Sequence, residues 1–294
     1  KCTICNSENV SNINTYKHFW RVCNVCGNAF SRIKEHYSLS ILPFKHLKKN
    51  IAISEDKANL YTFANASVEK IKQDEEQAIL LSDEWVNLYK INLQGKKFLE
   101  ISGGNGHFLN ALKKYDMELF HTELNSKDVA YVNNLLNIKS KQFDFENNEI
   151  QNLFSEKFDV ILLKGALEFC LDIKAFLEGI ENNTHPNTII IILTCVPTLG
   201  NFLLTQFDDY NQLALYQRDT LVNIFQEQDY LLLESRETGE TRNAYPLALY
   251  RNKWSRLLML RYMIPAMYSL STDKRFLFHA LSVRGLHLIF QKSK

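Results

Sequence analysis

The sequence lacks a net charge of either sign, a long hydrophobic run and an N-terminal signal segment. Its 34 lysines and arginines against 33 aspartates and glutamates give +1 at pH 7, so it has no overall basic field of the kind that non-specific nucleic-acid binding requires. The longest purely aliphatic stretch, residues 189–193, is too short to span a bilayer. The N-terminus opens directly into cysteines, without an apolar signal-peptide segment. We therefore expect a cytoplasmic protein with no transmembrane segment.

The composition also excludes disordered and fibrous proteins. With 46% hydrophobic, 23% charged and 12% aromatic residues, a chain of 294 residues can bury one substantial core and a small accessory unit. The charge is unevenly distributed, because residues 251–294 carry nine basic residues and a single acidic one, Asp273. The C-terminal region is therefore strongly basic although the chain as a whole is neutral.

Four of the six cysteines form two pairs, Cys2-x-x-Cys5 and Cys23-x-x-Cys26. Each pair lets two thiolates converge on one ion, so the spacing predicts a tetrahedral four-sulfur site with a structural role, for which we expect zinc. Iron in the same ligand set and two disulfides in an exported protein are the alternatives. The remaining cysteines, Cys170 and Cys195, lie in apolar sequence and are expected to be buried core thiols.

The rest of the chain alternates between strand and helix patterns. Apolar residues at helical spacing predict one or two amphipathic helices over residues 67–89. Strands are predicted at residues 97–101, 119–122, around 141–143, 158–163, 188–193, 230–234 and 286–292, with helices at 107–115, 127–136, 173–182 and 218–228. This alternation indicates a parallel sheet with helices on both faces, on which ligands bind at the carboxyl ends of the strands.

The spacing of the glycine turn after residue 101 argues against NAD. Read as GxGxxG, it has Gly104 and Gly106 but Leu109 in the third place, where the helix must approach the strand closely. By contrast, Glu100-x-x-x-Gly104-x-Gly106 places an acid at the strand end beside the glycines, which suits a positively charged, phosphate-free ligand. This combination resembles motif I of the class I S-adenosylmethionine-dependent methyltransferases.

The resemblance implies a role for each matched residue. In that family the first-strand acid, matched by Glu100, lies near the methionine part of the cofactor, and the glycine turn, here residues 103–106, packs against it. A second acid, matched by Glu123, binds the ribose hydroxyls, which suits charge-assisted hydrogen bonding. An acid after the third strand, matched by Asp144, reads the adenine amino group, and the apolar residue after it, Phe145, lies on the ring.

The resemblance covers about half of the chain, residues 95–197 and more weakly on to 234. Residues 158–169 are similar to the family's fourth strand and its Leu-Glu-His box, with Phe169 where histidine is usual, and Ser102 replaces the first glycine of the turn. The cofactor-binding residues that the resemblance implies are Glu100, Ser102, Gly103, Gly104, Asn105, Gly106, Glu123, Leu124, Asp144, Phe145, Lys164 and Gly165.

The predicted fold class is α/β, a Rossmann-like class I methyltransferase sheet with a small N-terminal zinc ribbon and a helical C-terminal insertion. The domains are a zinc-ribbon module at 1–40, a linker with amphipathic helices at 41–94, a cofactor-binding domain at 95–237 and 285–294, and the insertion at 238–284. The last strand is expected to be antiparallel, as in that family. The basic, aromatic-rich insertion is either a lid that selects an anionic acceptor or a helical pair that exposes its bases.

A four-cysteine module before such a domain resembles the sugar C-methyltransferases and related enzymes of surface-glycan and natural-product pathways. The leading hypothesis is therefore an S-adenosylmethionine-dependent methyltransferase with a small-molecule or glycan acceptor, which is anionic if the insertion selects it. One alternative is an rRNA base methyltransferase, because some of these also begin with a cysteine-rich module and residues 34–43 are similar to the sequence just after it. The neutral charge argues against nucleic acid without excluding it. Another is a catalytically silent scaffold, which would bind no adenosyl cofactor.

Methyl transfer needs little machinery, because the methyl group of a sulfonium is already activated. A hydroxyl or acidic C–H acceptor would also need a general base within hydrogen-bond reach. Candidates are His107, Glu168, Asp208, Asp209 and Tyr210, each of which also fits a surface or structural role, so that no catalytic residue is assigned. The acceptor, the methylated atom and the oligomeric state are left open.

Overall fold

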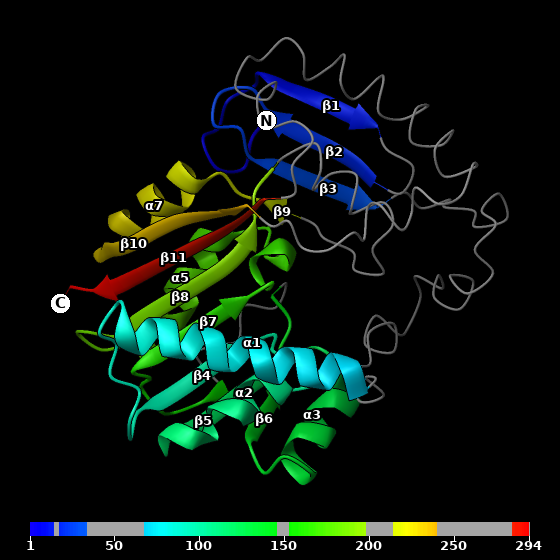
Figure 1. Ribbon diagram of the computed structural model, residues 1–294. Helices are drawn as coiled ribbons and strands as arrows, with labels where there is room; N and C mark the ends of the chain where they lie inside the picture. The colour runs from blue at the N-terminus through cyan, green and yellow to red at the C-terminus, as the bar shows by residue number, and fades with distance from the viewer. Residues whose placement is uncertain (15–17, 34–67, 146–152, 198–213, 240–283, 294) are drawn as a thin grey trace, which may run out of the picture. The chain divides into compact units, whose positions relative to one another are not determined.

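The computed structural model describes residues 1–14, 18–33, 68–145, 153–197, 214–239 and 284–293 (Figure 1). The chain divides into two compact units. Among the described residues, the first unit comprises 1–14, 18–33, 195–197, 214–223, 236–239 and 284–286, and the second comprises 68–145, 153–194, 224–235 and 287–293. The predicted insertion at 238–284, the segment 34–43 and the candidate bases Asp208, Asp209 and Tyr210 lie wholly or almost wholly outside the described residues.

The first unit contains a small antiparallel sheet in the order β1-β2-β3-β9. Its strands are β1 (Val10–Asn14), β2 (His18–Cys23), β3 (Ala29–Ile33) and β9 (Ala214–Leu215). Trp20, Val22 and Ala29 are buried in it. The turn between β2 and β3 carries the second cysteine pair, and Gly27 there has a φ of 73°, which favours glycine. Strand β9 joins this sheet from far along the chain.

The second sheet has seven strands in the order β10-β11-β8-β7-β4-β5-β6 (Figure 1). Its strands are β4 (Lys97–Ile101), β5 (Glu118–Glu123), β6 (Lys139–Gln142), β7 (Val160–Lys164), β8 (Ile189–Cys195), β10 (Tyr230–Gly239) and β11 (Arg284–Lys292). The five strands from β8 to β6 are parallel. Every predicted strand is present, and the expected α/β class is confirmed.

The sequence of the central strands explains why they are parallel and buried. Strands β7 and β8 are almost continuously apolar, as is typical of strands covered by helices on both faces. The last strand, β11, runs antiparallel to β8. Lys292 at the end of β11 donates its N–H to the carbonyl of Thr188 at the start of β8. The same residue accepts a hydrogen bond from the N–H of Asn187. The expected antiparallel last strand is therefore present.

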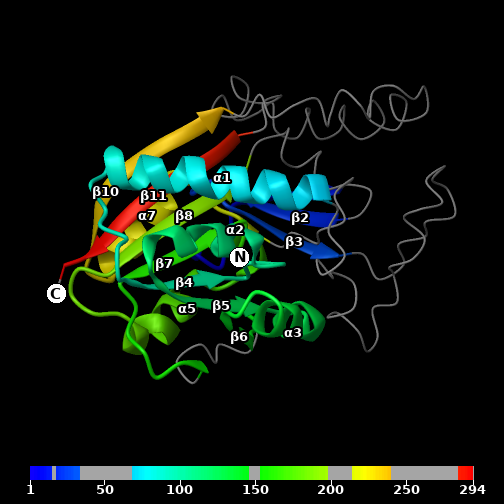
Figure 2. The same ribbon diagram turned by 60° about the horizontal axis from the view of Figure 1, so that its bottom comes forward.

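Helices cover both faces of this sheet. They are α1 (Val68–Asn87), α2 (His107–Ala111), η4 (Leu112–Tyr115), α3 (Ser126–Asn134), η5 (Leu167–Phe169), α5 (Ile173–Ile180), η6 (Glu181–Asn183) and α7 (Arg218–Glu227). Helices α1, α2 and α3 lie on one face and α5 on the other (Figures 1 and 2). The end of α7 lies beside α5, where the Lys174 ammonium is 2.8 Å from the Glu227 carboxylate.

Helix α1 packs on this sheet through its second half. The indole of Trp85 is fully buried, 6.4 Å from the ring of Phe98 on β4 and 6.4 Å from that of Phe108 on α2. The predicted helix is thus confirmed, but three of its apolar residues, Val68, Ile79 and Leu80, are exposed. The side of the helix that faces the core buries the polar residues Asp74 and Ser82.

Cys170 and Cys195, which lie outside the two CxxC motifs, differ in burial. Cys170 is buried, as expected, and its burial raises the pKa of its thiol to about 12. Cys195 is only half-buried, in contrast to the prediction. None of the helices in the described part of the chain combines the length and the apolar character needed to cross a bilayer.

Candidate functional site

The chain turns sharply at the carboxyl end of β4. Ser102, Gly104 and Gly106 all have φ between 55° and 71°, the left-handed region that favours glycine. Gly103 is required for space instead, because a Cβ there would lie 2.7 Å from the Glu100 carboxylate. At Gly106 a Cβ would lie 2.7 Å from the Val132 side chain on α3. The turn therefore lets the backbone pack directly against strand β5 and helix α3.

Glu100 is the penultimate residue of β4, and its carboxylate lies beneath the glycine turn. It is fully buried, and among the described residues neither of its oxygens has a hydrogen-bond partner. Burial raises the pKa of this carboxyl group to about 8, the nearby Lys164 ammonium opposes the rise, and Asp74 and Glu123 add to it. A buried acid with no partner is costly for the folded protein, so the position favours a bound cation or a hydrogen-bond donor.

Glu123 ends the adjacent strand β5 and reaches the same turn. One carboxylate oxygen accepts the Gly104 N–H at 3.0 Å, and the other accepts the N–H groups of Leu124 at 2.8 Å and Asn125 at 3.3 Å. Burial raises the pKa of Glu123, while these backbone donors lower it. The two predicted acids thus lie at adjacent strand ends, with the glycine turn between them.

The other predicted cofactor residues lie at the same edge of the sheet. Asp144 and Phe145 follow β6 and are half-buried, and the Phe145 ring is 5.4 Å from that of Phe176 on α5. The Lys164 ammonium at the end of β7 lies over the Phe108 ring, 4.9 Å from its centre. Next to it, Gly165 has a φ of 63°, and a Cβ there would meet no atom within 4 Å.

The two other predicted residues of the turn, Ser102 and Asn105, form hydrogen bonds within the protein. Ser102 donates its N–H to the hydroxyl of Thr122 at 3.2 Å. The Asn105 side-chain oxygen accepts the N–H of His107 at the start of α2, and its amide nitrogen is buried with no hydrogen-bond partner among the described residues. Asn105 thus binds the backbone at the start of α2 through its oxygen, and its amide nitrogen remains available within the described part of the chain.

A buried histidine behind the turn is a feature that the sequence analysis did not predict. His121 on β5 is fully buried, and its Nδ1 lies 2.8 Å from the Ser140 hydroxyl on β6. A Cβ at Gly103 would lie 2.7 Å from the His121 ring. Burial lowers the pKa of His121 to about 4, so the ring is neutral at pH 7. Its position two residues before Glu123, directly after Leu119 and Phe120, was the available signal.

Two candidate bases lie in the described part of the chain. His107 is buried, and its Nε2 is 2.9 Å from the Tyr131 hydroxyl, while its Nδ1 is 3.8 Å from the Glu75 carboxylate. Glu168 is buried in the short helix η5 after β7. Because both side chains are withdrawn from solvent, the geometry assigns neither a catalytic role.

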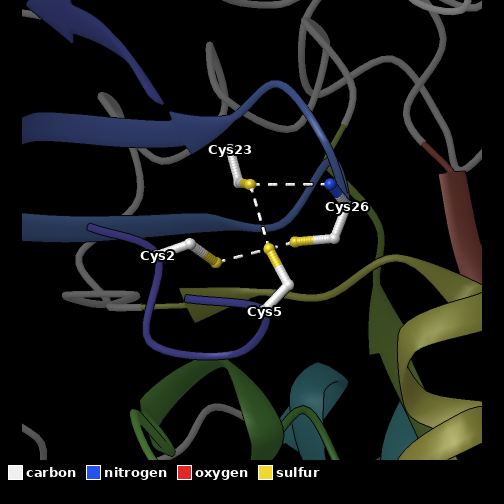
Figure 3. A group of neighbouring side chains, drawn as sticks. All are labelled: Cys2, Cys5, Cys23 and Cys26. Atoms are coloured by element: carbon white, nitrogen blue, oxygen red, sulfur yellow. Dashed lines mark hydrogen bonds between the residues drawn. The ribbon is translucent and has the colours of Figure 1, made fainter. Parts of the chain in front are cut away.

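The four paired cysteines converge in the first unit (Figure 3). Their sulfur atoms all lie within 4.8 Å of one another, with Cys2 Sγ 3.6 Å from Cys26 Sγ and Cys5 Sγ 3.5 Å from Cys23 Sγ. No disulfide bond joins Cys2, Cys5, Cys23 and Cys26, in contrast to the alternative of two disulfides. Sulfurs bound at about 2.3 Å around one tetrahedral ion lie about 3.8 Å apart. The arrangement therefore fits a single four-coordinate metal ion.

Comparison with known proteins places this fold in a family. A family described as "Methyltransferase domain" matches residues 74–235, more than half of the chain. The chain therefore belongs to the methyltransferase domain family. It is a methyltransferase enzyme with a mostly parallel seven-stranded sheet, and the cofactor of its class is S-adenosylmethionine. None of the curated proteins compared with this chain matches it.

Several solved structures are similar to this chain at low sequence identity. The YcgJ protein from Bacillus subtilis is 10% identical with a TM-score of 0.54, and the match covers 74% of this chain and 99% of that one. The [4+2]-cyclase SpnF is 13% identical with a TM-score of 0.50, covering 74% and 80%. An S-adenosylmethionine-dependent methyltransferase from Archaeoglobus fulgidus is 12% identical with a TM-score of 0.49, covering 77% and 100%. For YcgJ and SpnF, the likeness at these identities shows the fold alone.

Proposed function

We propose that this methyltransferase acts on a small-molecule or glycan acceptor and holds its cofactor at the glycine turn after β4. The observation that carries the cofactor site is the Glu100 carboxylate, which is fully buried with no hydrogen-bond partner among the described residues. S-adenosylmethionine has an ammonium and a sulfonium group. Their positive charge would compensate the negative charge of the buried Glu100 carboxylate. Gly103 and Gly106 let the turn pack closely on the side chains of Glu100 and Val132, which keeps the turn beside the carboxylate.

Each predicted residue then has a separate task. Glu100 faces the methionine part of the cofactor, and Glu123 accepts the ribose hydroxyls with a carboxylate already oriented by the Gly104 N–H. Asp144 binds the adenine amino group and Phe145 lies against the ring. Ser102, Asn105, Leu124, Lys164 and Gly165 complete the lining at the strand ends. When bound, S-adenosylmethionine supplies an activated methyl group, so these residues need only bind, orient and exclude water.

The acceptor class is supported by charge. A net charge of +1 is unusual for a protein that binds nucleic acid through its backbone, whereas the nine basic residues at 251–294 favour a localised anionic group. A sugar nucleotide or phosphorylated glycan has such a group. The four-cysteine module before the methyltransferase domain supports the same class by resemblance.

We also propose that Cys2, Cys5, Cys23 and Cys26 bind one zinc ion with a structural role. Four thiolates leave no coordination position for a substrate. The sheet of the first unit has strands of six residues or fewer, too little for an independent apolar core. The free energy of metal binding is then part of the free energy of folding.

Calorimetric titration tests the cofactor site. We expect the full-length protein to bind S-adenosylhomocysteine but not NAD, and Glu123→Gln to weaken this binding by about tenfold or more, since one charge-assisted bond is lost. Glu118→Gln is the matched control, because Glu118 begins the same strand at its opposite end and is exposed. Absence of binding to the wild type would favour the silent scaffold.

The acceptor is tested separately by methyl transfer from labelled cofactor to nucleotide sugars and to RNA. We expect transfer to a nucleotide sugar with weak dependence on ionic strength. Transfer to RNA, with an affinity that falls steeply with salt, would contradict the acceptor class and leave the cofactor site intact.

A further inference from the structure

A short segment far from the cysteines in sequence is part of the cysteine unit. Strand β9 pairs with β3 in the registers Ala29 with Leu215 and Phe30 with Ala214. The next residue, Tyr216, is fully buried with its ring edge-on to that of Phe30, 5.8 Å between centres. Residues 214–220 therefore depend for their structure on the strand that follows the second cysteine pair.

One buried side chain joins the cysteines to this segment. Asn28 is fully buried two residues after Cys26. Its amide nitrogen donates to the sulfur of Cys26 at 2.9 Å and to the Thr220 hydroxyl at 2.8 Å, and its oxygen accepts the N–H of Gln217 at 2.8 Å. Both hydrogens and the oxygen of the amide are thus used, and Thr220 lies 192 positions along the chain. The flipped amide would place its NH2 group against the N–H of Gln217, so the observed orientation is the one that satisfies all three partners.

The turn that holds Cys26 also touches the segment directly. A Cβ at Gly27 would lie 2.9 Å from the side chain of Gln217, so the glutamine packs on the turn where only glycine leaves room. The Gln217 side-chain amide donates to the Gly27 carbonyl at 3.4 Å. A change in the conformation of this turn therefore reaches the segment through two routes.

We propose that Asn28 is a positioning residue that couples metal binding by the four cysteines to the structure of residues 214–220. The inference rests on the proposed metal site. An N–H···S hydrogen bond stabilises a metal-bound thiolate, and outer partners of this kind orient the ligand. With the metal bound, Cys26 is fixed and Asn28 is held where it meets Gln217 and Thr220. Without it, the turn is released and both hydrogen bonds to the segment weaken.

The test uses Co²⁺ as the metal and the full-length protein. For the wild type we expect thiolate-to-cobalt charge-transfer bands on titration, and slower hydrogen exchange in residues 214–220, by about tenfold, when the metal is bound. Asn28→Ala should shift these bands, lower the metal affinity about 10- to 100-fold and, at saturating metal, abolish the effect of metal on exchange in 214–220. The shift of the charge-transfer bands reports the loss of the N–H···S bond. If Asn28 had only a structural role, its substitution would leave the position of these bands unchanged.

Two further variants make the outcome specific. Asn24→Ala is the matched control, because Asn24 lies in the same cysteine turn but bonds to Asn9 and Ser11 near β1; it should leave the effect on 214–220 unchanged. Thr220→Val removes a partner of Asn28 without touching Cys26. It should reduce the effect on exchange while the cobalt bands stay at their wild-type positions. This variant decides the question if Asn28→Ala does not fold.

The possible failures are distinguishable. If the wild type gives no charge-transfer bands, the proposed metal site is wrong and the coupling has no basis. If the wild type binds Co²⁺ but Asn28→Ala, or Thr220→Val in its place, shows the wild-type effect of metal on 214–220, the metal site stands and the role of Asn28 is wrong.

Discussion

The two units of this protein stabilise their chain in different ways. The second unit buries a continuous apolar core around Trp85, Phe98 and Phe108, and its central strands are apolar on both faces. The first has short strands and brings four sulfurs together instead. Ordering a residue costs about 1–2 kcal/mol of conformational entropy, which a large core offsets by burial and a small one does not. The comparison predicts that only the first unit depends on a metal.

The units also differ in how their buried polar groups are satisfied. In the first, the Asn28 amide uses all its donors and its acceptor within the unit. In the second, Glu100 is equally buried but has no hydrogen-bond partner among the described residues. An unmade hydrogen bond to a buried polar group costs about 1–3 kcal/mol, and more for a charge. We therefore interpret the fully bonded Asn28 as structural, whereas the unpartnered Glu100 is consistent with the proposed cofactor site.

Metal removal should give the largest effect and separate the units. We expect a strong chelator, or Cys23→Ser, to remove hydrogen-exchange protection from β1, β2 and β3, because metal binding to such sites contributes about 10–16 kcal/mol in isolated peptides. Strands β4, β7 and β8 should keep their protection. Cys170→Ser is the control cysteine, because it lies outside the sulfur cluster. Equal loss in both sheets would contradict the separation.

The glycine turn gives the next effect. Gly106→Ala should destabilise the protein by about 3 kcal/mol, because it combines a φ of 71° with a Cβ placed 2.7 Å from Val132. Gly95→Ala is the matched control, since Gly95 has a φ of 68° but open space around it; it should cost about 1 kcal/mol. Urea denaturation measures both. Equal losses would show that conformation alone, and not the close approach to α3, requires glycine at 106.

The substitution Glu100→Gln should change the free energy of unfolding by less than Gly106→Ala, and in the opposite direction. The folded pKa of Glu100, about 8, lies above the ordinary 4.5, so the folded state retains a proton that the unfolded state releases. Stability is therefore lost as pH rises from 4.5 to 8. Glu100→Gln should remove this loss and stabilise the ligand-free protein at pH 8 by about 2 kcal/mol, while it weakens cofactor binding.

Thermal unfolding at pH 5 and pH 8 checks this prediction, with calorimetry for the cofactor. Glu118→Gln is the control, because the pKa of Glu118 is lowered by its hydrogen bond to Lys139 instead of raised by burial. A Glu100→Gln protein that is less stable than the wild type at pH 8 would show that the carboxylate has a partner in solution.

Local patterns predicted the secondary structure well. Strand β4 matches its predicted bounds at both ends, and α7 matches within one residue. Runs of apolar residues and glycine turns act over a few positions, so the sequence contains the signal. The buried face of α1 was harder, because Asp74 and Ser82 are buried where Val68 and Ile79 are exposed. The burial of Asp74 and Ser82 depends on which other parts of the chain pack against α1, and helical periodicity does not contain that information.

The candidate site likewise has some features that the sequence predicts and others that it does not. The metal-ligand spacing and the acids at successive strand ends were predictable, since each follows from a short motif on a known type of element. The roles of those acids toward the cofactor stay predictions. The contact of Glu123 with the turn, the buried His121 behind it and the link from Asn28 to Thr220 were not predictable. Each joins residues that only the strand order brings together.

By itself, the sequence determined the α/β class, the cysteine cluster and the order of strands and helices of the larger sheet, because these follow from periodicity and the spacing of short motifs. Only the tertiary structure decided that Glu100 has no hydrogen-bond partner in the described part of the chain while Asn28 is fully bonded. Both outcomes depend on which distant groups reach a buried atom. Burial makes the presence or absence of such a partner energetically large.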